Sequence, residues 1–468
     1  MVVPHSGELS FNIRSLNLSR GSKSMKRFVA VAMLLVILME ARGVGQTREE
    51  KVRNDKARVE ADGYWMYNDL PGALAEGKRT GKPVVVVLRC LPCEECVKLD
   101  DEVIDADERV KGLLDQFVRV RIVGTNGLDL ELLQFDTDQS FAVFLLNGDG
   151  TIYGRFGTRS DRTEWIGDVS IDGFAQALQG ALELHRDYPQ NKEMLVAKRG
   201  PQPDFATPEQ YPALASRYKS TLDYQGKVVQ SCIHCHQIGE AKRNLILSRE
   251  GTLPEAVLFP FPHPKVVGLV LDPKERAAVL SVAAESAAAR AGFQTGDRIL
   301  KLRGEPLLSI ADVQWVLEQT PAEGGEIAAE VLRDGTVVAL KLSLAPGWRK
   351  RDDISWRVST WSLRRAALGG IHFMDLTEEE RQKLQIPSGS LGLIVQHVGK
   401  YPPHDVAHKA GVQKGDVLVE YNSRTDLTSE TEIIADRLLQ VPDQEEIRLT
   451  FLRGGKRETI LFSLPIVK

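Results

Sequence analysis

An internal repeat in the C-terminal part of the chain constrains the fold more than any other feature of the sequence. The stretch AARAGFQTGDRIL, which begins at Ala288, matches AHKAGVQKGDVLV, which begins at Ala407, at Ala-Gly, at Gln and at Gly-Asp. A second pair of stretches, VLRDGTVVALKLSL and FLRGGKRETILFSL, follows at a similar spacing. The sequence therefore predicts two copies of one module, and its 468 residues leave room for further domains ahead of them.

The region ahead of the repeat divides into two parts. Residues 60–188 alternate helix-like and strand-like stretches, among them the buried strand KPVVVVLRC and the amphipathic helix SIDGFAQALQGALELHRDY, which indicates an α/β domain. Residues 189–264 shift to Pro, Gln and charge, with linker-like ends at RGPQPDFATPEQYP and FPFPHP. We therefore predict a multidomain chain with an α/β domain, a short and mostly helical segment, and two α+β modules at 265–347 and 365–468.

The N-terminal sequence predicts export. From Met25, MKRFVAVAMLLVILMEARGVG has two basic residues, an apolar run and then small residues, as a secretory signal does. We expect a signal peptide at 25–45, an extension or misassigned start at 1–24, and a mature chain that is periplasmic or otherwise exported. An uncleaved anchor is the alternative and would be the only contact with a membrane. The net charge of −4 gives no field that would recruit nucleic acid.

Both copies of the repeat resemble the PDZ family, in the form found in exported bacterial proteins. The residues that carry the resemblance are Ala288, Gly292, Gly296, Asp297 and Gly304 in the first copy and Ala407, Gly411, Gly415 and Asp416 in the second. The resemblance implies that the C-terminus of a partner protein adds to each module as a strand, with its carboxylate held by an apolar-Gly-apolar loop. The matching loops are Val267, Gly268 and Leu269, and Leu368, Gly369, Gly370 and Ile371. The alternative is that both grooves serve only for packing.

Exported PDZ pairs often follow a serine protease domain. The sequence has no nucleophile motif such as Gly-Asp-Ser-Gly-Gly, and two cysteine-containing regions stand ahead of the modules instead. We therefore do not expect a serine protease.

Residues 60–188 resemble the thioredoxin superfamily, in the group that has GKP, a buried strand and then Cys-x-x-Cys at a helix start. The stretches that carry the resemblance are Gly81-Lys82-Pro83, Cys93-Glu94-Glu95-Cys96 with Leu99, and the late turn Gly148-Asp149-Gly150. The resemblance implies thiol–disulfide exchange, with Cys93 as the nucleophile and Cys96 as the resolving thiol. A thiol–disulfide oxidoreductase is thus one reading of the domain, and a redox-silent scaffold is the other.

Several residues depart from the thioredoxin pattern. Phe141 stands where the family places a cis-proline, Val87 where a buried acid is usual, and Pro92 where tryptophan is common. Glu94 and Glu95 add negative charge beside the thiols and oppose thiolate formation. Cys90 leaves three roles open: disulfide exchange with Cys93, metal binding, or packing at the strand end.

The stretch SCIHCHQIGEA contains a Cys-x-x-Cys-His motif and resembles c-type cytochromes. The resemblance implies a covalent haem c, with thioether bonds from Cys232 and Cys235 and an iron bond from His236. His263 is then the nearest downstream candidate for the second axial metal ligand, ahead of His234 and Met194. A zinc site formed by Cys232, His234, Cys235 and His236 competes with haem, and no nucleotide cofactor is expected.

The preferred function is extracytoplasmic redox chemistry. In this prediction the Cys93 and Cys96 dithiol and the haem carry electrons, while the PDZ-like modules bind peptides or C-termini of partner proteins, including a redox partner. One alternative is a non-catalytic adaptor with a redox-silent thioredoxin-like domain. The other is a haem-based sensor or electron carrier.

Overall fold

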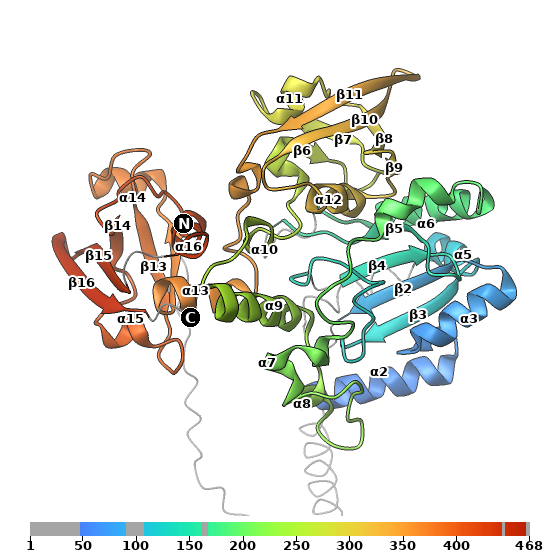
Figure 1. Cartoon of the computed structure of the whole chain (residues 1–468), viewed down its shortest axis with the longest axis horizontal. Helices are drawn as coiled ribbons and strands as arrows, with labels where there is room; N and C mark the ends of the chain where they lie inside the picture. The colour runs from blue at the N-terminus through green and yellow to red at the C-terminus, as the bar shows by residue number, and fades with distance from the viewer. Residues whose placement is uncertain (1–46, 90–106, 140, 161–166, 442–444, 465–468) are drawn as a thin grey trace, which may run out of the picture.

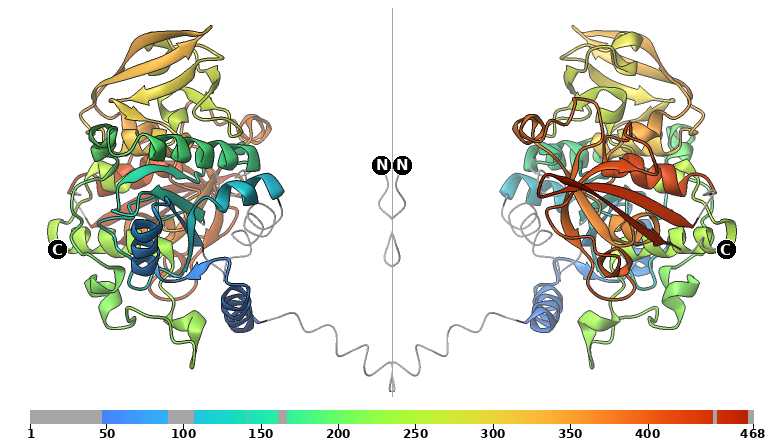
Figure 2. Two further views of the ribbon diagram at one scale, coloured as in Figure 1. Left: turned by 90° about the vertical axis from the view of Figure 1, so that its right-hand side faces the viewer. Right: turned by 90° about the vertical axis from the view of Figure 1, so that its left-hand side faces the viewer.

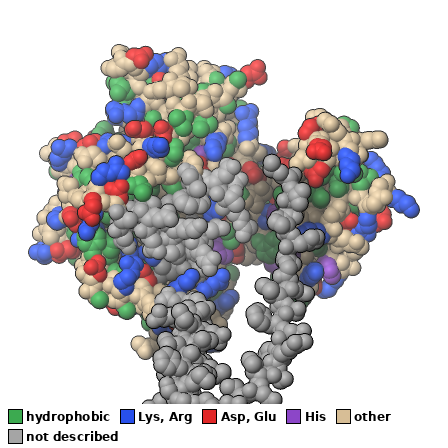
Figure 3. Space-filling model, turned by 180° about the vertical axis from the view of Figure 1, so that it is seen from behind, with side chains coloured by type: hydrophobic (Ala, Val, Ile, Leu, Met, Phe, Trp, Pro, Cys, Tyr) green, Lys and Arg blue, Asp and Glu red, His purple; other side chains and the backbone are tan. Residues whose placement is uncertain are grey.

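The computed structural model describes residues 47–89, 107–139, 141–160, 167–441 and 445–464 (Figure 1). The predicted signal peptide at 25–45 and the extension at 1–24 lie outside the described residues. In the described part of the chain, no helix is both long and apolar enough to span a bilayer. Figure 3 shows basic and acidic side chains interspersed over one face, in keeping with the small net charge.

The first domain is a five-stranded sheet with helices on both faces. Its strands lie in the order β1-β3-β2-β4-β5, with β1, β3 and β2 parallel and with β4 and β5 antiparallel to their neighbours. The elements are α2 (Arg48–Asp62), β1 (Met66–Tyr67), α3 (Leu70–Thr80), β2 (Val84–Arg89), α5 (Glu108–Leu114), β3 (Val118–Val123), β4 (Phe141–Leu146), β5 (Ile152–Phe156) and α6 (Ile171–Arg186). This architecture confirms the predicted α/β class.

The central strand β2 divides the core of this domain in two. Every residue of β2 is buried, which explains the apolar run Val84–Leu88 that precedes Arg89 at its end. Val84 and Val86 face a core that includes α3, whereas Val85 and Val87 face a core that includes α5 and α6. The period of two along a strand therefore places alternate valines in separate cores.

The segment that follows α6 is mostly helical, as the sequence predicts. It contains η2 (Lys192–Lys198), η3 (Pro208–Gln210), α7 (Pro212–Ala215), α8 (Val228–Ser231), α9 (Cys235–Glu250), α10 (Glu255–Leu258) and η4 (Pro264–Val267). Leu214 of α7 and Ile238 and Ala241 of α9 join the core on the Val84 face of the sheet. The segment is thus packed on the first domain, which supplies the apolar surface that its own sequence lacks.

The first copy of the repeat forms two small sheets. A two-stranded sheet of β6 (Leu269–Leu271) and β7 (Val279–Val282) lies beside a four-stranded sheet in the order β11-β10-β8-β9. The remaining elements are α11 (Ala287–Ala291), β8 (Arg298–Leu302), β9 (Glu305–Pro306), α12 (Ile310–Glu318), β10 (Gly325–Arg333) and β11 (Thr336–Leu344).

The second copy forms one five-stranded sheet in the order β12-β13-β14-β15-β16. Its elements are α13 (Thr360–Leu368), β12 (Ile371–Asp375), α14 (Glu378–Lys383), β13 (Leu393–Val398), α15 (Val406–Lys409), β14 (Val417–Tyr421), α16 (Glu430–Leu438), β15 (Glu446–Arg453) and β16 (Lys456–Ser463). The short helix η5 (Trp348–Arg351) joins the two modules, and Figure 2 shows the second module from its exposed side.

An aspartate–arginine pair recurs at the same place in both modules. Arg333 donates two hydrogen bonds of 2.7 Å to Asp297, and Arg453 donates bonds of 2.7 and 2.6 Å to Asp416. Each arginine also bonds the carbonyl of the glycine that ends the preceding short helix or turn, Gly292 or Gly411. The Gly-Asp and Leu-Arg matches in the repeat therefore belong to one structural unit.

A buried ion pair fixes the first module to the helical segment, and hydrogen bonds from β5 fix it to the sheet of the first domain. Lys198 of η2 lies 2.9 Å from Asp312 of α12, and both side chains are fully buried. Asp312 also accepts hydrogen bonds from the N–H groups of Arg155 on β5 and of Leu308. The guanidinium of Arg155 stacks on the ring of Trp315 in α12 at 3.7 Å. One face of α12 is thus occupied by the first domain.

The second module is joined to the rest of the chain through two arginines. Arg357 donates to both carboxylate oxygens of Asp136 at 2.7 Å, in the loop before β4. Arg349 bonds Glu318 at the end of α12. Asp352 lies beside Arg357 at 3.9 Å, and burial raises the pKa of Asp352 to about 7.

Replacing Lys198 by methionine should detach the first module. The substitution Lys198→Met leaves the carboxylate of Asp312 buried without its cation, so the free energy of unfolding should fall by about 3–5 kcal/mol. Chemical denaturation of the full chain measures this. The control is Lys301→Met, because Lys301 pairs with Glu330 at 3.1 Å with the two side chains 33% and 44% exposed, and its loss should cost less than about 1 kcal/mol. Equal losses in the two variants would contradict the prediction.

Candidate functional site

The predicted dithiol lies outside the described residues. Cys93 and Cys96, and with them Cys90, follow β2 in the range 90–106. The described end of β2 carries a buried Arg89, which lies 3.3 Å from Asp55 of α2. Phe141 is the partner of Arg89 across β2 and β4, at the position where the thioredoxin family places its cis-proline.

Cys232 is held in a closed position between α8 and α9. Its side chain is only 5% exposed, and a Cβ on Gly124 would lie 2.9 Å from its Sγ. The thiol points to the carbonyl of Ile233 at 3.6 Å. Burial raises the pKa of the Cys232 thiol to about 12. Cys232 is therefore neutral at physiological pH and shielded from solvent.

Cys235 and the two histidines lie at the start of α9. His234 is the N-cap residue of α9, and Cys235 is half-buried against the core on the Val84 face. His236 Nδ1 lies 3.0 Å from a carboxylate oxygen of Glu240, one turn later in the helix. The ring of His236 stacks on that of His234, with centroids 5.9 Å apart. Glu240 thus fixes the orientation of the His236 imidazole and leaves Nε2 as its second nitrogen.

These residues fit a covalent haem only in part. The pairing of His236 with Glu240 suits an axial ligand, because metal-bound histidines commonly use their second nitrogen to bond a carboxylate. The buried Sγ of Cys232 does not fit, since a porphyrin edge bonded to it would have to occupy the space of Gly124 and its surroundings. Among the described residues, no group of three or more His, Cys, Asp or Glu side chains is arranged to hold a metal ion, so the zinc alternative has no assembled site.

His263 lies at the boundary between the first domain and the first module. Its Nδ1 accepts a hydrogen bond from the N–H of Lys265, and its Nε2 lies 3.5 Å from Asp168. Ser160 donates to Asp168 at 2.7 Å and accepts from Lys265 at 2.8 Å. Burial lowers the pKa of His263. His263 and His236 thus have different carboxylate neighbours, Asp168 and Glu240.

The first predicted peptide loop leads into a strand with a free edge. Gly268 ends η4 in the left-handed conformation, at φ 92°, and Leu269 begins β6. The C=O of Gly268 and the N–H of Asp272 bond toward β7. Because backbone groups alternate along a strand, those of Leu269 and Leu271 point to the opposite edge, which pairs with no described strand. Such an edge is the feature that strand addition needs.

The second predicted loop leads into a strand whose edge is closed. Gly369 and Gly370 follow α13, both with positive φ, and Ile371 begins β12. The N–H of Phe373 points away from β13 and donates to Glu430 of α16 at 2.8 Å. Arg364 of α13 bonds the same carboxylate at 2.6 Å, and both side chains are buried. A side chain of the module thus occupies the donor that a peptide carbonyl would use.

Sequence reasoning found both loops but missed Arg364 and Glu430. Neither residue forms a motif, since they are 66 positions apart and only the fold brings them together. The arginines of the Asp–Arg pairs are visible in the sequence, because the dipeptide Leu-Arg recurs in both copies of the repeat.

Comparisons with known families confirm the thioredoxin resemblance and the PDZ resemblance of the first copy of the repeat. Residues 65–148 match the family described as thioredoxin-like, and residues 265–344 match the PDZ domain family. The PDZ match covers the first copy of the repeat. The chain therefore contains a thioredoxin-like domain followed by a PDZ domain.

Curated relatives are periplasmic proteins. The chain is 26% identical over 188 residues to a probable periplasmic serine endoprotease DegP-like of Pseudomonas fluorescens, which is 40% of this chain and 37% of that protein. It is 27% identical over 154 residues to periplasmic serine endoprotease DegP of Salmonella typhimurium, which is 33% of this chain and 28% of the relative. The alignments thus span less than two fifths of either relative. The solved HtrA-type protease AlgW with tripeptide is 12% identical, covers 30% of this chain and 51% of its own, and has a TM-score of 0.18.

Cys232 should resist alkylation in the folded protein. With a pKa of about 12, its thiolate fraction at pH 8 is about a thousandfold below that of an unfolded cysteine, and burial adds a barrier. Timed iodoacetamide labelling followed by peptide mass spectrometry measures the rate at this residue. The control is the same peptide labelled in urea. A native rate within tenfold of the denatured rate would contradict the closed position of Cys232.

Proposed function

We propose that the chain is an extracytoplasmic peptide-binding protein. Its PDZ domain captures the C-termini of partner proteins, and its thioredoxin-like domain is the structural support on which the PDZ domain is fixed. The observation that supports this most directly is the free edge of β6 behind Gly268. The match of residues 265–344 to the PDZ family supports the same reading. Peptides bind such edges through main-chain hydrogen bonds, with the carboxylate at the glycine loop.

The second copy of the repeat is proposed as a PDZ-like module that serves for packing. Its Asp416–Arg453 pair has the same geometry as the Asp297–Arg333 pair of the PDZ domain. Its strand edge, however, is closed by Glu430, so a peptide would have to displace a carboxylate that Arg364 holds in place. Peptide binding therefore belongs to the first module in this proposal.

Export is supported by the relatives. Both curated proteins compared above are named as periplasmic, and the signal-like sequence at 25–45 agrees with that location. The names also describe serine endoproteases, but the matched regions cover less than two fifths of those chains. We propose peptide capture without proteolysis, because the chain has no serine nucleophile motif.

A matched pair of glycine substitutions tests the proposal. Gly268→Val should weaken peptide binding at least tenfold, because valine is strained at φ 92° and would overlap Ser286 at the loop. Gly370→Val is the control, since it puts the same strain at φ 93°, against His404, in the closed module. The probe is a pool of synthetic decapeptides with apolar C-terminal residues, measured by fluorescence anisotropy.

Amidated peptides complete this experiment without any substitution. The unmodified chain should bind free C-termini at least tenfold more tightly than the amides, since the loop is proposed to hold the carboxylate. Equal affinity for acid and amide would contradict the role of the loop. A larger loss of peptide affinity with Gly370→Val than with Gly268→Val would contradict the proposal and indicate that the second module binds the peptide.

Covalent haem is a second candidate, which one observation favours. Glu240 orients His236 with one nitrogen left for an axial bond, and a bound haem would supply one-electron transfer. The buried Cys232 opposes this candidate, because attachment needs its sulfur to leave the contact with Gly124. Expression in a host with c-type haem maturation decides the matter. Haem absorbance that survives denaturation and is lost in Cys232→Ala/Cys235→Ala would establish it, and a colourless chain would end it.

A further inference from the structure

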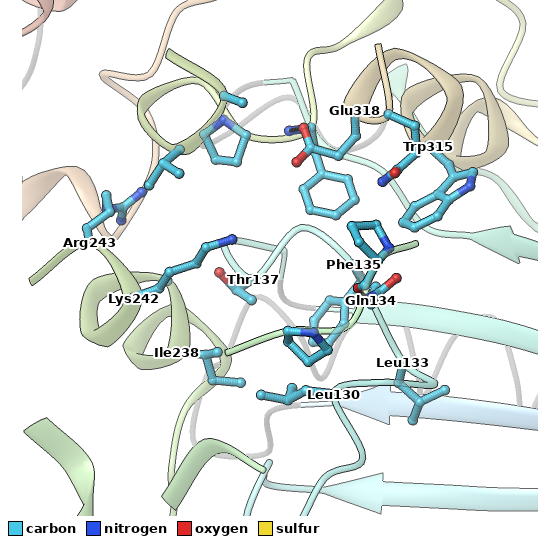
Figure 4. A pocket seen from close by; sticks show the side chains of 18 of the residues that line it. Leu130, Leu133, Gln134, Phe135, Thr137, Ile238, Lys242, Arg243, Trp315 and Glu318 are labelled. Atoms are coloured by element: carbon cyan, nitrogen blue, oxygen red, sulfur yellow. Dashed lines mark hydrogen bonds between the residues drawn. The ribbon is translucent and has the colours of Figure 1, made fainter. Parts of the chain in front are cut away.

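A cavity of about 250 Å³ lies where the first domain, the helical segment and the PDZ domain meet. Its apolar wall includes Leu130, Leu133, Phe135, Ile238, Phe261 and Trp315. Figure 4 shows Leu130, Leu133 and Ile238 along one side, with Trp315 at one end. The volume is just below the range usual for small-molecule sites, so a ligand of about amino-acid size would fill it.

Arg243 of α9 gives this cavity an unusual polar end. Its side chain is 3% exposed, and its Nε and Nη2 have no hydrogen-bond partner among the described residues. Three carboxylates attract Arg243 from nearby, those of Asp138, Glu240 and Asp136, but none of them forms a hydrogen bond with it. Each is bonded to another residue instead, Asp138 to Ser359, Glu240 to His236 and Asp136 to Arg357. Burial lowers the pKa of the Arg243 guanidinium, although these carboxylates oppose the shift. A buried guanidinium with two unpartnered nitrogens at the wall of a cavity has donors available for an anion.

Lys242 adds a second cation to the same end. In Figure 4 its side chain extends into the cavity, and its Nζ forms no ion pair in the described part of the chain. Glu318 lines the opposite end, where Arg349 and the N–H of Phe261 already bond its carboxylate. The cavity thus has a positive end, an apolar middle and a compensated acidic end.

Gly239 lies in the cavity wall, and Gly200 packs beside the Trp315 ring at the edge of the cavity. A Cβ at Gly239 would lie 2.7 Å from the hydroxyl of Thr137 and 3.8 Å from Nη2 of Arg243. A Cβ at Gly200 would lie 2.6 Å from Gln134 and 2.9 Å from the Trp315 ring. At both positions a side chain would collide with its neighbours, so glycine allows Thr137 and the Trp315 ring to pack closely there.

We propose that this cavity is a binding site for a small apolar monocarboxylate, whose carboxylate pairs with Arg243 and Lys242 and whose apolar body lies against Phe135 and Trp315. A carboxylate matches the fork of guanidinium donors. A dianion such as phosphate is disfavoured, because the rest of the wall is apolar and Glu318 lies across from it. The carboxylate belongs either to a free small acid or to the C-terminal residue of a peptide.

This site is separate from the β6 edge. The cavity is lined by α9 and by the C-terminal part of α12, whereas the proposed peptide loop is formed by Val267, Gly268 and Leu269. A failure of one proposal therefore leaves the other intact.

The test uses the full chain with 3-phenylpropionate and its neutral isostere 3-phenylpropionamide, in isothermal titration calorimetry. The acid should bind at least tenfold more tightly than the amide. Arg243→Met should lower the affinity for the acid at least tenfold and leave the affinity for the amide unchanged. Arg249→Met is the control, since Arg249 is exposed on the same helix and does not line the cavity. The acid and amide comparison needs no variant, so it stands even if Arg243→Met fails to fold.

A peptide arm identifies the source of the carboxylate. A decapeptide ending in Phe with a free C-terminus is titrated into the unmodified chain, Arg243→Met and Gly268→Val. Binding that is lost only with Arg243→Met assigns the cavity to a peptide terminus, and tight binding of 3-phenylpropionate assigns it to a free acid. The proposal is overturned if acid and amide bind alike, or if neither the acid nor the peptide responds to Arg243→Met.

Discussion

Buried ion pairs between domains are the constraint on which the rest of this structure depends. Lys198 and Asp312 fix the PDZ domain to the helical segment that packs on the first domain, and Arg357 and Asp136 fix the second module to the loop before β4. A buried charge is tolerated only when its partner is in place, so each pair specifies one docking geometry. The cavity beside Arg243 exists because these contacts hold three segments at a fixed spacing.

The two copies of the repeat have diverged in how they treat their strand edges. Both retain the Asp–Arg pair that supports the turn, because this pair belongs to the fold of the module. The edge of β6 pairs with no described strand, while Glu430 closes that of β12. One buried carboxylate thus separates a module with an open strand edge from a module with a closed one, while the Asp–Arg pair is the same in both.

Local patterns in the sequence predicted much of the fold. The valine run predicted β2 as a buried strand, and the Gly-Asp matches predicted the two modules. The division of the β2 valines between two cores is known only from the structure. The features that could not be predicted join residues far apart in the sequence. Lys198 and Asp312 are 114 positions apart, and Arg357 and Asp136 are 221 apart. A lysine or an aspartate with no local motif gives no sign that it will be buried against a distant partner.

The Cys-x-x-Cys-His motif also shows that spacing in the sequence does not determine the geometry of a site. Its spacing predicted a cofactor, yet the geometry depends on Gly124 and Glu240, of which the first is remote in sequence. Gly124 lies against the buried sulfur of Cys232, and Glu240 orients the imidazole of His236. The motif therefore contains one residue whose position suits haem and one whose position does not.

The burial of Asp352 and His263 has a consequence for the response of the chain to acid. Burial raises the pKa of Asp352 to about 7, so this residue makes folding less favourable as the pH rises from about 4 to 7. Burial lowers the pKa of His263, so this residue makes folding less favourable as the pH falls below about 6.5. Where these two pH ranges overlap, the contributions of Asp352 and His263 to the pH dependence of the free energy of unfolding have opposite signs and partly cancel. Asp352 and His263, each at an interdomain boundary, therefore respond to mild acidification in opposite directions.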